Sequence, residues 1–421
     1  MEQESRLREA PTTQPADAGP SRVGVTRLGY ATNVFRGDSL GEVIGAIDGP
    51  LTRLRARFPV SELAGIELRL GGASIQEISG SPAAKERLGD SLRRSRLAVL
   101  TMNGFSPRGF HDREVKEAAY RPTWLEAERI SYTHALAQVL ADLLSPGASG
   151  AISTSPGSFK AFGHGESVLA SVAEGYAEAA FLLAEIESRS GHRILLSIEP
   201  EPGCTIESTA ELVSFFEDHL LTAGARYLAK RRGLSAPQAE ALLRRHLAAT
   251  FDTCHLSVQF EDLVDSANRL SQAGIRIAKV HATSGLRIDR PREQPELVAR
   301  LRSYARSPYL HQVTGIDAQG SIRLRAADLE RTLRDPDSLS ACEEVRIHFH
   351  LPLFVGEIGP LATTADETVA AVRHIVGGGL CDIVVLETYT WTVLHEIPGF
   401  EGLDVESGIA REIRWARENL L

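Results

Sequence analysis

The chain has few cysteines and no long apolar run, and each shortage excludes a class of protein. Its 421 residues include four cysteines, and none is spaced as in a paired metal site or a disulfide framework: Cys204, Cys254, Cys342 and Cys381. We therefore expect reduced thiols in a cytoplasmic protein. No segment approaches the roughly 18 continuous apolar residues of a membrane helix, so we expect no membrane insertion. Residues 1–22 also lack the apolar core of a signal peptide.

An excess of positive charge is also lacking. Lys and Arg total 46 against 55 Asp and Glu, which gives a formal net charge of −9. Nucleic-acid-binding proteins usually carry a basic balance, so we expect a small-molecule substrate and no nucleic-acid partner. Hydrophobic residues at 43% and charged residues at 24% are typical of a folded globular chain and exclude global disorder. The oligomeric state stays open, a homo-oligomer included.

Short apolar runs alternate with amphipathic segments along the chain. Eight runs are expected to be strands: 25–33, 65–70, 97–103, 150–154, 194–199, 249–252, 275–281 and 383–387. Several are nearly all apolar, which is typical of parallel strands buried on both faces. Capping boxes such as the one from Ser208 to Glu211 mark helix starts between them. This order favours one α/β domain over 25–421, a (β/α)8 TIM barrel, with a doubly wound sheet as the alternative.

Three segments depart from the strand–helix order. Residues 1–24 are polar with several prolines, so we expect a disordered tail. A helical hairpin is expected at about 220–248, and a large arginine-rich insertion at about 282–355 separates the seventh strand from the eighth. The insertion contains three strand-like pieces, at 309–313, 321–324 and 345–349. We interpret it as a small sheet that caps the catalytic face of the barrel.

Four consecutive predicted strands end in a residue that binds metals. Glu199 ends the fifth strand, Asp252 the sixth, His281 the seventh and Glu387 the eighth. The carboxyl ends of all barrel strands meet at one mouth, where active sites form. Three carboxylates and one imidazole suit Mn²⁺, Mg²⁺, Co²⁺ or Zn²⁺. A single acid after a strand is usually a loop residue or a helix N-cap, but four in consecutive strands predict one shared metal site.

Three more histidines fall in the same part of the predicted fold. His255 lies three residues after Asp252, so a turn leaving the strand would aim both side chains into the mouth. His348 and His350 are two apart on a predicted strand and therefore point to the same face. The alternatives stay open: a single metal, a second metal held by His255 with His348 or His350, or two histidines exposed on an inserted strand.

Five residues near the predicted mouth are expected to contact substrate. They are Asn103 after the third strand, Glu201 two residues past Glu199, Arg287 six residues past His281, His311 in the insertion, and Trp391 shortly after Glu387. The alternatives are a solvated charged loop for Arg287, a helix cap for Glu201 and plain packing for Trp391.

The strand-end residues carry a family resemblance. Glu after the fifth strand, Asp-x-x-His after the sixth, His after the seventh and Glu after the eighth resemble the xylose-isomerase-like superfamily, which includes sugar epimerases, inosose dehydratases and endonuclease IV. More closely, seven stretches over about residues 27 to 395 resemble the EboE metabolite-traffic family: Leu28-Gly-Tyr-Ala-Thr-Asn33, Thr101-Met-Asn-Gly-Phe105, Glu199-Pro-Glu-Pro-Gly-Cys204, Asp252-Thr-Cys-His255, Tyr309-Leu-His-Gln-Val313, His348-Phe-His-Leu-Pro352 and Glu387-Thr-Tyr-Thr-Trp391. That family belongs to a bacterial gene cluster implicated in making or moving a prenylated secondary metabolite.

The resemblance implies a metal-dependent isomerase or epimerase that acts on a sugar, a cyclitol or a related polyol derivative. In such enzymes the metal binds two adjacent oxygens of a hydroxy-ketone, and two carboxylates flank the carbon that loses its proton. By analogy Glu199 and Glu387 would be ligands and also the acid/base pair, and His255 would be a further catalytic residue.

The resemblance also leaves two other functions open. Endonuclease IV has an Asp-x-His pair where His348 and His350 stand, which favours a metallohydrolase of phosphoesters. Its remaining zinc histidines have no counterpart here, because Gly71-Gly72 and Asn103-Gly104 stand in their places. The third alternative is a non-catalytic protein that binds or moves a metabolite.

Overall fold

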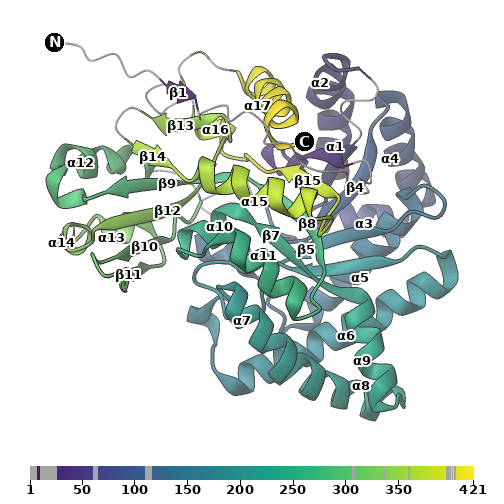
Figure 1. Ribbon diagram of the computed structural model, residues 1–421. Coiled ribbons are helices and arrows are strands. Elements are labelled where there is room, and N and C mark those ends of the chain that lie inside the picture. The colour runs from purple at the N-terminus through teal and green to yellow at the C-terminus, as the bar shows by residue number, and fades with distance from the viewer. Residues whose placement is uncertain are drawn as a thin grey trace.

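The computed structural model describes a barrel with a second sheet beside it. It covers residues 7–9, 26–59, 65–109, 116–305, 309–335, 337–358, 361–394, 400, 402 and 404–421. Eight parallel strands close into a barrel in the order β15-β2-β3-β4-β5-β6-β7-β8. Their bounds are Arg27–Ala31 (β2), Gly65–Arg69 (β3), Ala98–Asn103 (β4), Gly150–Thr154 (β5), Ile194–Ile198 (β6), Leu247–Asp252 (β7), Ile277–Ala282 (β8) and Ile383–Leu386 (β15). Figure 1 shows the helices around this barrel and the second sheet to its left.

The barrel agrees with the sequence prediction. Each predicted strand is present with both ends within two residues of the expected position. The last strand, β15, pairs with β2 and with β8, which closes the cylinder and excludes a doubly wound sheet. Every residue of β3, β5 and β6 is buried, as expected for strands covered on both faces.

Helices follow the strands around the outside of the barrel. They are α1 (Leu40–Ala46), α2 (Thr52–Ala56), α3 (Gly72–Gly80), α4 (Pro82–Ser95), α5 (Ala127–Leu143), α6 (Glu166–Ser190), α7 (Thr209–Ser214), α10 (Thr253–Val258), α11 (Leu263–Gln272), α15 (Ala365–Gly377), α16 (Trp391–Leu394) and α17 (Val405–Leu420). The capping box predicted at Ser208 is present, since its hydroxyl accepts a hydrogen bond from the Glu211 amide at 3.2 Å.

Shorter helical turns complete the connections. They are η1 (Thr32–Val34), η2 (Ile47–Leu51), η3 (Lys116–Tyr120), η4 (Lys160–Phe162), η5 (Phe215–Gly224) and η6 (Pro291–Glu293), of which η2 and η5 are π-helical. The predicted helical hairpin at 220–248 is formed by the end of η5 with α8 (Ala225–Arg232) and α9 (Ala236–His246). The last two residues of the predicted range, 247 and 248, belong to β7 instead.

One described helix, α6, has the length and the apolar composition of a membrane span. Its most apolar window is 44% buried inside the protein. The apolar side of α6 packs on neighbours such as α5 and η5, which is ordinary for a helix of a barrel. This helix is therefore weak evidence for a membrane.

The large insertion forms an antiparallel sheet with the order β1-β13-β14-β9-β12-β10-β11 among the described strands. Its strands are β1 (Leu7–Glu9), β9 (Ser284–Asp289), β10 (Val313–Ile316), β11 (Ile322–Ala326), β12 (Glu344–Leu351), β13 (Val355–Ile358) and β14 (Leu361–Thr363), and its helices are α12 (Pro295–Tyr304), α13 (Leu329–Thr332) and α14 (Asp337–Ser340). The sheet thus runs past the predicted end at 355.

One strand of the insertion is displaced from its predicted place. The expected strand at 309–313 begins only at Val313, because the residues before it turn toward the barrel, where the Gln312 side chain donates to the Pro202 carbonyl at 2.9 Å. The tail predicted as disordered over 1–24 lies outside the described residues except for Leu7–Glu9, which pair with β13.

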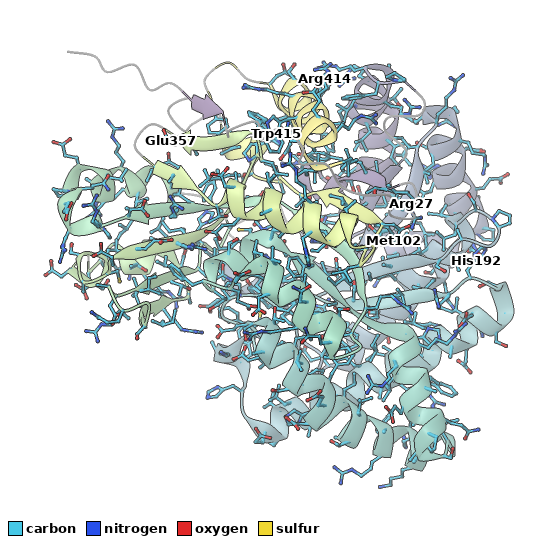
Figure 2. All side chains as sticks on the ribbon, viewed as in Figure 1. Arg27, Met102, His192, Glu357, Arg414 and Trp415 are labelled. Atoms are coloured by element: carbon cyan, nitrogen blue, oxygen red, sulfur yellow. The ribbon has the colours of Figure 1, made fainter. Side chains whose placement is uncertain are left out.

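A buried carboxylate joins the last helix to the barrel and to the insertion. Glu412 of α17 is fully buried and accepts hydrogen bonds from the Thr388 hydroxyl at 2.8 Å, the Tyr30 hydroxyl at 3.1 Å and the Leu353 amide at 3.2 Å. These partners lie after β15, on β2 and in the turn after β12. The adjoining residues Arg414 and Trp415 mark this helix in Figure 2.

Glu412 makes the stability of the fold depend on pH. Burial raises the pKa of Glu412 to about 7, whereas the unfolded chain releases this proton near the usual value of about 4.3. The folded state therefore binds more protons than the unfolded state between these values, so Glu412 lowers stability as pH rises through this window. The full effect is on the order of 3 kcal/mol.

We expect Glu412→Gln to flatten this pH dependence, because an amide of the same size does not titrate. The free energy of unfolding, measured by urea titration at several pH values from 4.5 to 7.5, should fall less steeply with pH in the variant than in the wild type. Equal slopes for the two proteins would contradict the assignment.

Candidate metal centre

The structure brings the four predicted metal ligands together at the carboxyl ends of the barrel strands. His281 Nδ1 lies 2.7 Å from Glu199 Oε1, 2.9 Å from Glu387 Oε2 and 3.7 Å from Asp252 Oδ2. One ligand atom from each of the four residues lies within 4.8 Å of the others, and all four side chains are buried. Residues separated by nearly two hundred positions therefore share one small volume.

Strand register explains this convergence. Asp252 ends β7 and is paired with His281 of β8, which in turn is paired with Val385 of β15. Glu199 and Glu387 each follow their strands directly. Parallel strands in register place these positions at the same height, and barrel closure turns them toward a common axis.

Two orphaned oxygens show that a divalent cation fits this set. Glu199 Oε2 and Asp252 Oδ2 are buried and accept no hydrogen bond from any described residue. A buried carboxylate oxygen without a partner costs free energy, and three carboxylates in one volume repel each other. A divalent ion would offset both costs, and three oxygen donors with one imidazole form a donor set suited to Mn²⁺, Mg²⁺, Co²⁺ or Zn²⁺.

Two asparagines fix the orientation of Glu387. Its Oε1 accepts hydrogen bonds from Asn33 Nδ2 at 2.8 Å and from Asn103 Nδ2 at 3.0 Å, which leaves Oε2 facing His281. Asn103 was predicted to contact substrate, and it lies on the cavity wall. The sequence analysis missed Asn33, although Asn33 is a polar residue at the end of a barrel strand, which is the signal that identified the four metal ligands.

The ionisable groups of this cluster have shifted pKa values because they are buried and lie close to one another. Burial raises the pKa of Glu387, and His281 opposes this only in part. Burial alone would raise the pKa of Asp252, but the neighbouring histidines, chiefly His255 and His350, lower this pKa below its usual range. Against burial, Glu387, Glu67 and Glu199 raise the pKa of His281 well above its ordinary value, so metal binding must displace a proton from this ring.

Three further histidines lie beside the first cluster, each with Nδ1 directed at an oxygen. His255 Nδ1 lies 3.0 Å from the Pro200 carbonyl, and His350 Nδ1 lies 2.9 Å from the Glu387 carbonyl. His348 Nδ1 lies 2.6 Å from Gln312 Oε1, an oxygen identified by the donation of Gln312 Nε2 to the Pro202 carbonyl. Because each oxygen only accepts, each Nδ1 carries the hydrogen, and burial lowers the pKa of His348 and of His350, so their Nε2 atoms carry lone pairs. Against burial, Asp252 and Glu201 raise the pKa of His255 to about 9, so a cation would have to displace a hydrogen from its Nε2.

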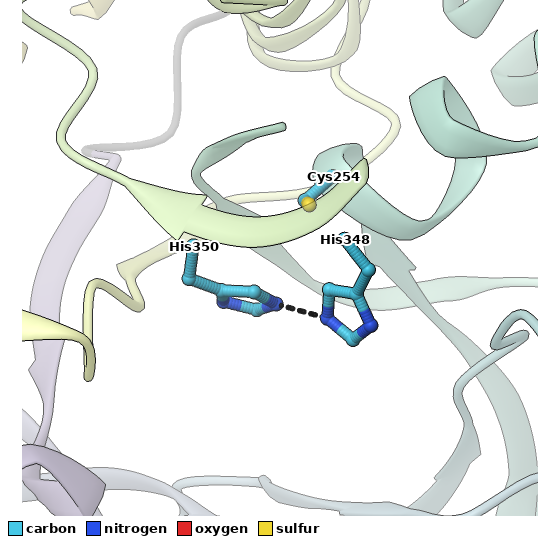
Figure 3. A group of neighbouring side chains, drawn as sticks. All are labelled: Cys254, His348 and His350. Carbon is cyan, nitrogen blue, oxygen red and sulfur yellow. Dashed lines mark hydrogen bonds between the residues drawn. The ribbon is translucent and has the colours of Figure 1, made fainter. Parts of the chain in front are cut away.

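These lone pairs face one another. His348 Nε2 and His350 Nε2 are 3.0 Å apart, and both rings project to the same side of β12 (Figure 3). His255 joins His350 and Asp252 in one group of potential ligands, and joins His348 and Glu201 in another. Burial lowers the pKa of His350 to about 4 and holds that of His348 well below its usual value, so protonation does not relieve the repulsion near neutral pH. The donor set fits a second cation.

Cys254, also drawn in Figure 3, belongs to α10 and lies near this pair. Its Sγ is 3.9 Å from the Phe349 carbonyl, and burial raises the pKa of the thiol well above its usual value. A thiol that stays protonated is a poor nucleophile, but a bound cation would displace the proton, and Cys254 forms a further group of potential ligands with His348 and His350.

A cavity opens onto both clusters. Its floor includes Glu199, Glu387, His255, His348 and His350. Its walls combine four aromatic rings with two cationic side chains, namely Phe105, Tyr120, Tyr309 and Tyr389 with Arg69 and Lys116. Glu201, predicted to contact substrate, also lines the cavity and accepts a 2.5 Å hydrogen bond from the Tyr120 hydroxyl.

Three predicted substrate contacts lie elsewhere. Arg287 projects from β9 away from the cavity, with its Nε 3.3 Å from Asp289 Oδ1. Trp391 is core packing, since its indole donates to the Tyr30 hydroxyl at 2.8 Å and its ring stacks near Phe354. His311 lies behind β12, where its Nδ1 donates to the His348 carbonyl at 2.8 Å and its ring stacks on Phe349.

Comparisons with solved structures return other barrel proteins at low identity. No family model and no curated protein matches the chain, so the resemblance to the EboE family stays a prediction. A xylose isomerase-like TIM barrel protein from Mycobacterium smegmatis in complex with magnesium is 11% identical, over 94% of this chain and 96% of that one, with a TM-score of 0.49. An L-ribulose 3-epimerase is 14% identical over 93% of each chain, with a TM-score of 0.44.

A third solved structure, the 3-keto-D-glucoside 4-epimerase from E. coli, is 15% identical, over 75% of this chain and 98% of that one, with a TM-score of 0.34. At these values the similarity concerns the barrel architecture only, which the strand order already establishes.

We expect Glu199→Gln and Glu387→Gln each to weaken binding of Mn²⁺ at least tenfold, because each replaces an anionic donor by a neutral one. Isothermal titration of the metal-free protein measures this. Glu207→Gln is the matched control, since Glu207 is buried and paired with Lys160 and Arg325 but belongs to neither cluster. Unchanged affinity in both site variants would remove these residues from the ligand set.

Proposed function

We propose that the protein is a divalent-metal-dependent isomerase or epimerase that acts on a sugar, a cyclitol or a related polyol derivative. The observation that carries the proposal is the placement of two glutamates, Glu199 and Glu387, 2.7 Å and 2.9 Å from the same His281 nitrogen. Both line the floor of one cavity, so a substrate bound there would have a carboxylate on either side of a reacting carbon.

The proposed chemistry moves protons between carbon atoms. A bound divalent ion would polarise the carbonyl of a hydroxy-ketone and make the neighbouring C–H acidic. One glutamate takes the proton from that carbon, and the C–H bond breaks. In an epimerisation the other glutamate then gives a proton to the opposite face of the same carbon, and in an isomerisation a glutamate gives a proton to the former carbonyl carbon. In the second case the hydroxyl proton also moves to the other oxygen, so no atom is gained or lost.

The cavity supports a polyol substrate of this kind. Asn33 and Asn103 hold one oxygen of Glu387, which keeps its carboxylate oriented through a proton transfer. His255 and Glu201 add polar groups beside the metal ligands, and the aromatic side chains around them offer flat apolar faces to the C–H side of a sugar ring. In this proposal His255 binds a substrate oxygen.

We expect the Mn²⁺-loaded protein to exchange a carbon-bound hydrogen of its substrate with solvent. A panel of ketoses and inososes in D₂O, followed by mass spectrometry, detects this without knowledge of the product. Glu387→Gln should slow the exchange by about 10²–10⁴-fold, the usual contribution of a positioned acid or base. The control Glu207→Gln should exchange at the wild-type rate. Equal exchange in the Glu387 variant would exclude this residue from the proton transfer.

A metallohydrolase of phosphoesters is the second candidate, and the converging nitrogens of His255, His348 and His350 favour it. Two ions side by side stabilise the attacking and leaving oxygens of a phosphoryl group. The acidic charge balance of the chain argues against DNA as the substrate.

We expect elemental analysis after Zn²⁺ loading to separate the candidates. One ion per chain favours the isomerase. Two ions in the wild type and one in His348→Ala with His350→Ala, together with cleavage of bis(p-nitrophenyl) phosphate, favour the hydrolase. Metal bound with neither exchange nor cleavage favours a metabolite-binding protein. A place in a secondary-metabolite pathway rests on the EboE resemblance alone, and a cytoplasmic location on composition.

A further inference from the structure

A buried ion pair lies inside the barrel beneath the metal centre. Glu67 is the central residue of β3, and Lys279 lies two residues before His281 on β8. Both side chains are completely buried, and the Lys279 ammonium contacts the Glu67 carboxylate directly. Lys279 also donates to the carbonyl of Met102 at 3.2 Å, a residue labelled within the barrel in Figure 2. Since β3 and β8 are not neighbours in the barrel, the pair spans its interior.

The same carboxylate reaches the metal-site histidine. His281 Nε2 lies 3.2 Å from Glu67 Oε1 and 3.0 Å from Oε2. The Thr101 hydroxyl donates to Oε1 at 2.9 Å and helps to fix the position of the carboxylate. An ionised carboxylate only accepts hydrogen bonds, so Nε2 must carry a hydrogen. The other ring nitrogen, Nδ1, is the atom that faces the three carboxylates of the metal centre.

Stability alone gives no reason for this pair. Interiors of such barrels are filled mainly by branched apolar side chains, and a buried ion pair can often be replaced by apolar residues without loss of stability. Lys279 instead contacts the Glu67 carboxylate at the place where that carboxylate meets His281.

We propose that Glu67 and Lys279 are positioning residues that hold His281 in the tautomer and orientation in which Nδ1 binds the metal. The inference rests on the metal centre of the proposed function and extends it to two residues that touch no ligand atom of the ion. Histidine ligands of metals commonly donate their second nitrogen to a carboxylate, and loss of that partner weakens metal binding by 10- to 100-fold.

The first experiment compares metal affinity in Glu67→Gln and in the wild type. The substitution keeps the size of the side chain but removes its charge and leaves Lys279 unpaired near the ring. We expect the dissociation constant for Zn²⁺, measured by competition with a chromogenic chelator, to rise 10- to 100-fold. Glu207→Gln also removes a buried carboxylate that pairs with a lysine, in a pair that includes no residue of the metal centre, and should keep the wild-type value. A wild-type dissociation constant in Glu67→Gln would overturn the inference.

The second experiment is read in the wild-type protein, and a variant serves only to assign the signal. In the wild-type protein loaded with Zn²⁺, ¹⁵N NMR of the histidine rings reports which nitrogen of His281 carries hydrogen, with the signal assigned by its loss in His281→Gln. We expect hydrogen on Nε2 and metal on Nδ1. Hydrogen on Nδ1 in the protein with Zn²⁺ bound would overturn the inference and leave the metal to the three carboxylates alone. Absence of Zn²⁺ binding by the wild type would instead overturn the proposed function together with this inference.

Discussion

The constraint on which the site depends is the repulsion among three carboxylates that are buried at the mouth of the barrel. The rest of the site has to offset this repulsion. Glu199, Asp252 and Glu387 surround one imidazole, and two of their oxygens accept no hydrogen bond from the described residues. Like charges at such distances destabilise a fold unless a cation offsets them. Neighbouring donors stabilise this charge. Asn33 and Asn103 donate hydrogen bonds to Glu387 Oε1, and the backbone amide of His255 donates to Asp252 Oδ1 at 2.9 Å.

The inserted sheet completes the site instead of only covering it. Strand β12 supplies His348 and His350, and side chains from the barrel loops hold the sheet in place. Gln312 donates to the Tyr120 hydroxyl at 2.7 Å, and Lys116 pairs with Asp328 at 2.7 Å. The insertion therefore shapes both the second group of histidines and one wall of the cavity, which ties its position to the chemistry of the barrel.

The sequence predicts what depends on position along one strand. The barrel strands are short apolar runs, and Glu199, Asp252, His281 and Glu387 are polar residues at their ends, so strand order alone brings them together. His255 and Glu201 follow from the same logic because they lie within three residues of those ends. The inserted strand at Val313 began later than expected, since the residues before it form side-chain bonds to the barrel that a linear pattern does not contain.

The sequence does not show in which direction a side chain points once the strand has ended. Arg287 and Trp391 lie close in sequence to ligands, yet one faces outward and the other packs into the core. Glu67 and Lys279 were missed because a charge within an apolar run looks like an interruption of the strand. That interruption was in fact the available signal, since a charged residue in the centre of a buried strand needs a buried partner.

Closure of the barrel by its eighth strand has a consequence for biosynthesis. Strand β15 pairs with both β8 and β2, which are far apart in the chain, and Glu387 follows β15 directly. The nascent chain on a ribosome consequently has an open, curved sheet and an incomplete coordination sphere until residue 387 has emerged. In the proposed metal centre, the ion would therefore reach its complete set of ligands only after translation.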